Sequence, residues 1–229
     1  MIPWTLLDTA KIPGGGELRL KRRGAEFSIM LSGNELMNSR LSGSEQALAL
    51  LAGKKIQSCP RPNVLIGGLG MGFTLRAALA AFGSNATITV AELVPAVVAW
   101  ARGPMAELFC DMLDDSRVVM RQADVAQLIG SARATYDAIL LDVDNGPDGL
   151  TAPHNDRLYD MAGLAAARAS LKSGGVLAVW SSAPDEKFTQ RLRKRGFSVE
   201  IECVRANGAR GGARHFIWLA VRPASNVSD

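Results

Sequence analysis

A glycine-rich turn and the acid that follows it are the residues best suited to chemistry. The turn connects an apolar run at 64–66 to a helical pattern, and a second apolar run ends at Glu92. Its glycines are Gly67, Gly68, Gly70 and Gly72. Glycines allow the backbone to approach a ligand closely, a helix N-terminus offers free N–H groups, and an acid about 20 residues later accepts hydrogen bonds from ribose hydroxyls. The pattern indicates a nucleoside-containing cofactor; a tight strand–helix turn without a ligand is the alternative, which the position of Glu92 disfavours.

Three further acids follow predicted strands. Asp124 comes after the third strand, Asp142 ends the fourth, and Asp144 lies two residues beyond it. Ligands of open parallel sheets bind at the carboxyl ends of the strands. Asp124 is therefore placed to accept from an exocyclic adenine amine, to cap the following helix, or to do both. Asp142 and Asp144 lie where the reacting end of a cofactor would be, although Asp-Asn-Gly-Pro at 144–147 is also ordinary turn chemistry.

The elements that must position these residues alternate between helices and strands from residue 44 onward. Helices are expected at 44–51, 72–82, 95–102, 104–113, 124–129, 156–171 and 185–195. Strands are expected at 64–66, 87–91, 117–120, 136–142, 176–180, 197–204 and 214–222. This alternation predicts an α/β, Rossmann-like domain whose seven-stranded sheet is mostly parallel and ends in an antiparallel hairpin.

The first 40 or so residues have a different pattern. Apolar and polar residues alternate at 17–22, 26–31 and 35–37, with glycine-containing turns between them. This pattern predicts a small antiparallel β meander. A sheet this small buries little by itself, so it must pack on the main domain or on a partner subunit. We therefore expect a meander at 1–42, a nucleoside-binding domain at 43–229, and a homodimer that uses the exposed meander edges.

The composition excludes several classes of protein. None of the apolar runs in the 229 residues reaches the ~18 residues of a membrane helix, and the N-terminus shows no secretory pattern. Three scattered cysteines (Cys59, Cys110 and Cys203) and two distant histidines (His154 and His215) offer no paired spacing. We therefore expect no metal, no disulfide framework and no membrane partner, in a cytoplasmic protein.

Basic residues are in modest excess, with a net charge of +4 and a pI near 9.2. They gather at 191–195 and 205–214, where they would suit phosphates. A solvated helix face and a polar hairpin loop explain the same residues more simply. A nucleic-acid partner is therefore not the favoured interpretation.

Taken together, these features resemble the spermidine synthase family, the polyamine aminopropyltransferases. The resemblance covers the N-terminal meander, the glycine loop, Glu92, the turn at Asp124, the segment YDAILLDVDNGP at 136–147 and the segment LKSGGVLAV at 171–179. It implies the class I S-adenosylmethionine-dependent methyltransferase fold. It also implies that Glu92 binds the ribose, that Asp124 binds the adenine and that Asp142 is the catalytic acid.

The chain departs from the family pattern around the reacting centre. The family loop usually reads GGGDGG, and its acid helps to hold the amine of decarboxylated S-adenosylmethionine; Gly70 occupies that position here. Gly43-Ser44-Glu45 replaces the family's Tyr-Gln pair, and arginine and glycine replace its later acceptor segment. Candidates for holding a polyamine are the acids Asp142, Asp144, Asp148 and Glu45, together with Trp180 as an aromatic wall, unless that tryptophan simply packs in the core.

These features predict a transferase that binds a sulfonium nucleoside and displaces a thioether in line. Asp142, assisted by Asp144, would accept the proton of an amine acceptor, which is a polyamine by resemblance. The expected donor is S-adenosylmethionine or its decarboxylated form. Methyl transfer to an unknown acceptor, suggested by Gly70, remains open. So do a non-catalytic binding module and a nucleic-acid-modifying enzyme.

Overall fold

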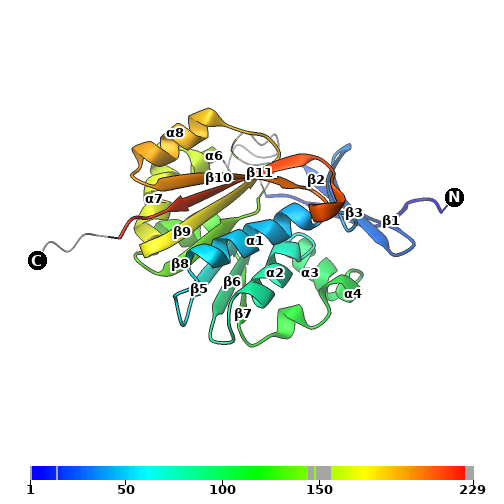
Figure 1. Ribbon diagram of the computed structural model, residues 1–229. Helices are drawn as coiled ribbons and strands as arrows, with labels where there is room; N and C mark the ends of the chain where they lie inside the picture. The colour runs from blue at the N-terminus through cyan, green and yellow to red at the C-terminus, as the bar shows by residue number, and fades with distance from the viewer. Residues whose placement is uncertain (1, 14, 144–146, 148–155, 225–229) are drawn as a thin grey trace, which may run out of the picture.

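The computed structural model describes residues 2–13, 15–143, 147 and 156–224. Two sheets dominate the described part (Figure 1). A four-stranded antiparallel sheet is formed by the N-terminal segment, and a seven-stranded sheet is formed by the rest. None of the helices within the described ranges is long and apolar enough to cross a lipid bilayer.

The small sheet is the expected meander with one additional strand. Its strands, in the order in which they pair, are β1 (Thr5–Lys11), β2 (Glu17–Arg23), β3 (Glu26–Leu31) and β4 (Asn34–Asn38). Strand β1 shows no alternation of apolar and polar residues because most of its side chains are exposed on both faces. Leu20 and Phe27 are buried in the core shared with the larger sheet, so the meander packs on its own chain. The boundary at 42/43 remains a prediction.

The large sheet confirms the predicted fold class. Its strands are β5 (Asn63–Gly67), β6 (Thr87–Glu92), β7 (Val118–Gln122), β8 (Tyr136–Leu141), β9 (Leu171–Ser181), β10 (Ser198–Arg205) and β11 (Arg214–Val221). Their order is β10-β11-β9-β8-β5-β6-β7. Strands β5 to β9 pair in parallel, whereas β11 runs antiparallel to both β9 and β10. The carboxyl ends of β5, β6 and β8 therefore meet at one edge.

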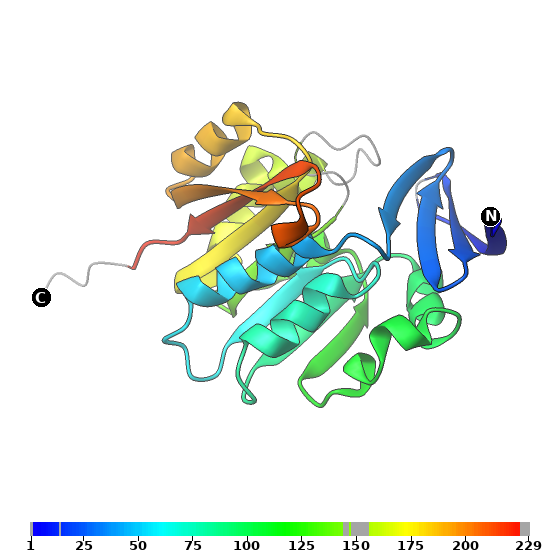
Figure 2. The same ribbon diagram turned by 45° about the vertical axis from the view of Figure 1, so that its right-hand side comes forward.

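Helices cover both faces of this sheet (Figure 2). They are α1 (Gly43–Lys55), α2 (Phe73–Ala81), α3 (Pro95–Arg102), α4 (Ala106–Phe109), α5 (Val125–Ser131), α6 (Asp156–Tyr159), α7 (Met161–Ser170) and α8 (Glu186–Lys194). Alternate residues of β5 serve the two faces: Val64 and Ile66 pack with α1 and α2, whereas Leu65 packs on the side of α5 and α7. Such residues, buried on both faces, give the nearly continuous apolar runs seen in the sequence.

Two predicted helices were wrong in detail. The helix at 104–113 is divided, because Cys110 has φ of 47° and ends α4 before a short 3-10 turn at Met112–Asp114. The helix at 156–171 is also divided. Asp160 accepts a hydrogen bond from the Gly163 amide at 2.7 Å and caps a new helix, α7. At the start of α1, Ser42 is the N-cap residue but makes no side-chain capping bond, and Ser44 bonds elsewhere.

The N-cap of α2 yields a stability prediction. Gly72 has φ of 76°, and a Cβ atom there would lie 2.5 Å from the Phe109 ring. Gly174 has the same φ of 76°, but a Cβ atom there would meet nothing within 4 Å. Gly174→Ala should lower the free energy of unfolding by about 1–2 kcal/mol through left-handed strain alone. Gly72→Ala should cost about 1–3 kcal/mol more, because the ring must move.

Urea denaturation of the two variants would measure this difference. Because both glycines carry the same backbone strain, the comparison isolates the contact with Phe109. Equal losses of stability would contradict the packing described for the glycine loop.

Candidate functional site

A cavity of about 230 Å³ lies between the two sheets, at the carboxyl edge of the larger one. Figure 2 shows the four-stranded sheet facing this edge. The small sheet and its connections supply an apolar wall of Ile12, Pro13, Leu18, Ile29, Leu31, Leu36 and Met37. The opposite wall carries the polar groups Glu45, Glu92, Asp124 and Asp142, the backbone of Gly68 and Gly70, and Trp180. The cavity thus joins an apolar cover to an acidic floor.

The glycine loop is held in place by Glu92, at the end of β6. Glu92 Oε2 accepts a hydrogen bond from the Leu69 amide at 2.9 Å, and Oε1 accepts from the Val94 amide at 2.8 Å. Burial raises the pKa of Glu92, while these backbone N–H groups oppose the rise. A carboxylate has about four acceptor positions, so room remains for ligand hydroxyls. Glu92 therefore braces the loop and still faces the cavity.

The four predicted glycines differ in what they contact. Gly68 and Gly70 line the cavity. Gly68 has φ of 90°, and a Cβ atom there would lie 2.6 Å from the Asp142 carbonyl oxygen, so the two strand ends approach closely only without a side chain. Gly67 packs against Val125, and Gly72 packs against Phe109. The last two shape the loop and do not line the cavity.

Asp124 caps a helix and also lines the cavity, so the structure is compatible with both interpretations that the sequence left open. Its Oδ1 accepts a hydrogen bond from the Ala126 amide at 2.8 Å, which caps α5. The same residue lines the cavity, on the side of β6 and β7. A helix cap and a ligand contact are therefore compatible at this position.

Asp142 and Glu45 place two carboxyl groups in one cavity. Thr74 Oγ1 donates to Asp142 Oδ2 at 2.5 Å. Burial and then the negative charge of Glu45 raise the pKa of Asp142 to about 7, and the bond from Thr74 opposes the rise. Burial likewise raises the pKa of Glu45. Two such groups near neutral pH hold protons readily and attract a cation strongly.

The sequence did not assign Glu45 to the site with the same weight as Asp142. It marked Glu45 only as one source of charge for a polyamine, whereas the structure brings it beside Asp142. The start of α1 is fixed by the hairpin loop, because the Gly43 amide donates to the Ala206 carbonyl at 2.9 Å. That long-range contact has no local sequence signal. The predicted Asp144 and Asp148 lie outside the described residues.

Trp180 lies in the cavity wall, as the sequence suggested. Its ring meets the imidazole of His215 edge-to-face, with centroids 4.7 Å apart. Its buried Nε1 has no hydrogen-bond partner among the residues that the structure describes. Buried donors without partners are uncommon, and a bound ligand with an acceptor would satisfy this one.

The basic residues fit a structural role. Arg191 pairs with Asp185, and β10 separates the α8 arginines from those of the hairpin loop. A surface hollow near the C-terminal ends of α5, α7 and α8 is lined by Arg133, Arg168, Arg195 and Arg222. Helix C-termini attract cations, and Arg133 donates to the Gly130 and Ala132 carbonyls there. Arg133 therefore stabilises the C-terminal end of α5.

The described residues contain no group of three or more His, Cys, Asp or Glu side chains that could hold a metal ion. The cavity's carboxylates are held by Thr74, Ser44 and backbone amides instead. These contacts leave the acids available to hydroxyl and ammonium groups.

Comparisons with known sequences and structures identify similar proteins. No protein-family profile matches the chain. Polyamine aminopropyltransferase 1 of Streptomyces coelicolor is 34% identical over 129 residues, which is 56% of this chain and 23% of that protein. The aligned part therefore spans less than a quarter of that relative's length.

Two solved structures show the fold. A spermidine synthase in complex with the transition-state analogue AdoDATO superposes with a TM-score of 0.76 at 18% identity, covering 97% of this chain and 75% of that one. Human methyltransferase-like protein 13 in complex with SAH has a TM-score of 0.55 at 18% identity, covering 81% of each chain. The chain thus has the fold that spermidine synthases share with methyltransferases, and the resemblance predicted from the sequence is confirmed.

The carboxyl pair predicts how stability depends on pH. Because the pKa of Asp142 is raised to about 7, its favourable contribution is complete below the unfolded-state pKa and is lost as the pH rises through 7. Asp142→Asn cannot ionise and keeps an acceptor for Thr74. The variant should therefore gain about 2 kcal/mol of unfolding free energy relative to wild type between about pH 5 and pH 8.

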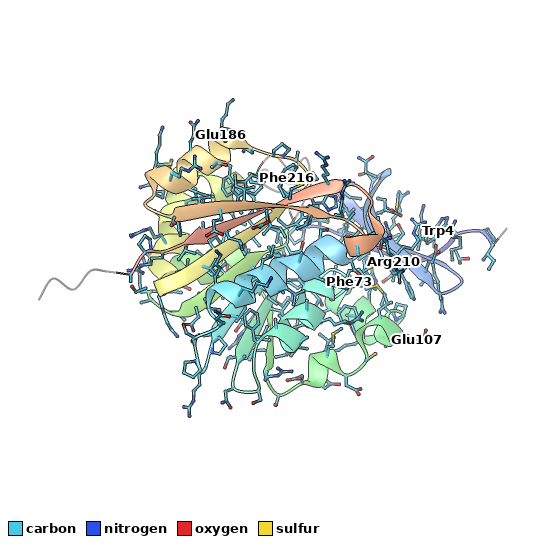
Figure 3. All side chains as sticks on the ribbon, viewed as in Figure 1. Trp4, Phe73, Glu107, Glu186, Arg210 and Phe216 are labelled. Atoms are coloured by element: carbon cyan, nitrogen blue, oxygen red, sulfur yellow. The ribbon has the colours of Figure 1, made fainter. Side chains whose placement is uncertain are left out.

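Urea titrations across that range would test the difference. Glu107→Gln, on the exposed surface of α4, is a matched control in which another acid is replaced by its amide (Figure 3). Parallel stability curves for wild type and Asp142→Asn would contradict the environment described for Asp142.

Proposed function

We propose that this protein transfers the aminopropyl group of decarboxylated S-adenosylmethionine to an amine acceptor of the polyamine class. The observation that carries the proposal is the carboxyl pair of Asp142 and Glu45 in the same cavity as the glycine loop and Glu92. An adenosine site next to paired acids suits a nucleoside that carries an ammonium group. The similarity to a polyamine aminopropyltransferase and to spermidine synthase structures supports this choice.

The donor would lie along the edge of the large sheet. Gly68 and Gly70 allow its close approach, Glu92 accepts from the ribose hydroxyls, and Asp124 lies where adenine would bind. The apolar side chains of the small sheet cover the nucleoside and exclude water. When bound, the sulfonium supplies an already activated carbon, so the protein mainly has to position the two reactants.

Glu45 would supply the negative charge for the donor's amine that the glycine loop lacks at Gly70. The loop lacks the acid that would face the donor's amine, and Met37 lies where a side chain at position 70 would begin, with its Cε and Sδ 2.8 Å from such a Cβ atom. Glu45 brings a carboxylate to the cavity from α1 instead. The carboxylate of ordinary S-adenosylmethionine would add a further negative charge beside two acids. The pair therefore favours the decarboxylated donor.

Asp142 is the group that would act on the acceptor. A protonated amine must lose a proton before its nitrogen can attack the carbon bonded to sulfur. Asp142 accepts that proton while Thr74 fixes its orientation. The new C–N bond forms as the C–S bond breaks, and the electron pair of that bond leaves with the neutral thioether. Asp144 remains a proposed assistant of this step.

A methyltransferase is the second candidate. It is supported by Gly70, which leaves the loop uncharged, and by the fold shared with human methyltransferase-like protein 13. This candidate requires the cavity to accept the carboxylate of S-adenosylmethionine. Donor preference therefore separates the two functions.

Calorimetry with the two donors, and with methylthioadenosine, tests the proposal. Decarboxylated S-adenosylmethionine should bind at least about 10-fold more tightly than S-adenosylmethionine, a difference of about 1.4 kcal/mol. With a linear diamine as acceptor, chromatography should detect methylthioadenosine, and Asp142→Asn should lower kcat by about 10²–10⁴-fold. Glu107→Gln should leave both measurements unchanged. Tighter binding of the carboxylated donor would defeat the aminopropyl proposal.

We also propose that two copies associate through β1. It is the edge strand of the small sheet, and its outward edge has no pairing strand among the described residues. Three exposed apolar side chains gather on or near it: Ile2, Leu6 and Leu7, with exposed fractions of 64%, 52% and 39%. Apolar edge strands readily pair with a second copy.

Light scattering should therefore give the mass of a dimer, and Leu6→Lys should give a monomer. Leu50→Lys provides the control, because Leu50 is comparably exposed on α1, away from β1. A wild-type monomer at micromolar concentration would refute the dimer.

The cytoplasm remains the proposed location. Cys59, Cys110 and Cys203 are all free. Free thiols persist in reducing compartments, which fits a biosynthetic enzyme that acts on small amines.

A further inference from the structure

A chain of hydrogen bonds leads away from the carboxyl pair. Ser44 Oγ donates to Glu45 Oε2 at 2.7 Å, and Ser44 Oγ also lies 2.9 Å from His215 Nδ1. We infer that Glu45, Ser44 and His215 form a proton path through which the proton lost by the acceptor amine leaves the cavity. This inference rests on the proposed function, to which it adds an exit for the proton.

Ser44 is suited to the middle of such a path. Its side chain is fully buried, and it contacts one group on each side. A hydroxyl carries one proton and two acceptor lone pairs, and its hydrogen rotates to suit its neighbours. Ser44 can therefore receive a proton from Glu45 while it passes its own proton to His215.

His215 is suited to the outer end. It is the second residue of β11, next to the exposed Arg214, and is itself only partly buried. The edge-to-face contact with Trp180 restricts its ring. Imidazole has two nitrogens, so it can take a proton on one side and release another on the other side. The ring thus connects the buried serine to the surface.

The electrostatic surroundings favour exchange between the two ends. Glu45 and Asp142 are the ionisable groups of the cavity near Ser44, while Thr74, Ser44 and Trp180 are neutral. Burial raises the pKa of Glu45 and lowers the pKa of His215. The pKa values of a carboxyl group and an imidazole normally differ by about two, so these opposite shifts bring the two pKa values closer together. These shifts lower the cost of moving a proton from Glu45 to His215.

The transfer balances in three steps. The ammonium of the acceptor gives its proton to Asp142, and the carboxyl pair shares it. Glu45 then gives a proton to the Ser44 oxygen while the Ser44 proton moves to His215 Nδ1. His215 releases the proton bound to its other nitrogen to solvent. The carboxylates are restored, and no oxidant or metal takes part.

His215→Gln tests the path because glutamine can keep a hydrogen bond to Ser44 but neither gains nor loses a proton near neutral pH. The path predicts a kcat at least about 10-fold lower, with KM for both substrates little changed. His215→Ala should show the same loss, and added imidazole should restore at least part of the rate. Arg214→Ala is the control and should match wild type.

Thermal unfolding of each variant distinguishes the path from a merely structural role. If His215→Gln is as stable as wild type and still slow, with rescue of His215→Ala by imidazole, the path is supported. Full activity of His215→Gln would overturn it. So would a loss of rate in His215→Ala that imidazole does not restore at any pH.

A measurement without turnover keeps this test separate from that of the proposed function. The chain has two histidines, so ¹⁵N spectra of a His154→Gln protein report on His215 alone. The Nδ1 resonance should respond to the ionisation of the carboxyl pair, and this response should disappear in Ser44→Ala and in Glu45→Gln. Identical titrations in all three proteins would overturn the path. Absence of turnover with any amine would contradict the proposed function, whereas the ¹⁵N titration of His215 would still show whether the hydrogen-bonded path exists.

Discussion

The rest of the structure depends on the repulsion between two carboxyl groups enclosed in one cavity. Asp142 follows β8 and Glu45 lies in the first turn of α1; burial, and then the negative charge of Glu45, raise the pKa of Asp142 to about 7. Ionising both groups without a cation is costly, because each charge is partly removed from water. A bound ammonium would remove that cost. The fold maintains this unfavourable pairing through Thr74 and Ser44, which is what a site for an amine requires.

In the proposed function, the surrounding elements would make this pairing specific to a nucleoside donor. Glu92 fixes the glycine loop through two backbone amides, and the small sheet places an apolar cover over the same cavity. Met37 fills the space at which a loop acid would otherwise start. The anion therefore enters from α1 and not from the loop.

The sequence predicted much of this arrangement, for identifiable physical reasons. Strands buried on both faces leave continuous apolar runs, so β5, β6 and β8 were located along with the acids at or after their ends, Glu92 and Asp142. Features set by distant contacts were missed. The position of Glu45 depends on the Gly43–Ala206 contact, and the exposed β1 has no alternation of apolar and polar residues. Helices α6 and α7, which are separated at Asp160, have the sequence pattern of one continuous helix.

A crystal structure with methylthioadenosine and a linear diamine would test the central claim most directly. The account predicts the ribose hydroxyls at Glu92, the sulfur directed toward Asp142, and one ammonium group between the carboxyl groups of Asp142 and Glu45. Adenosine bound with its sulfur turned away, or an amine bound elsewhere while the two acids face each other alone, would contradict it.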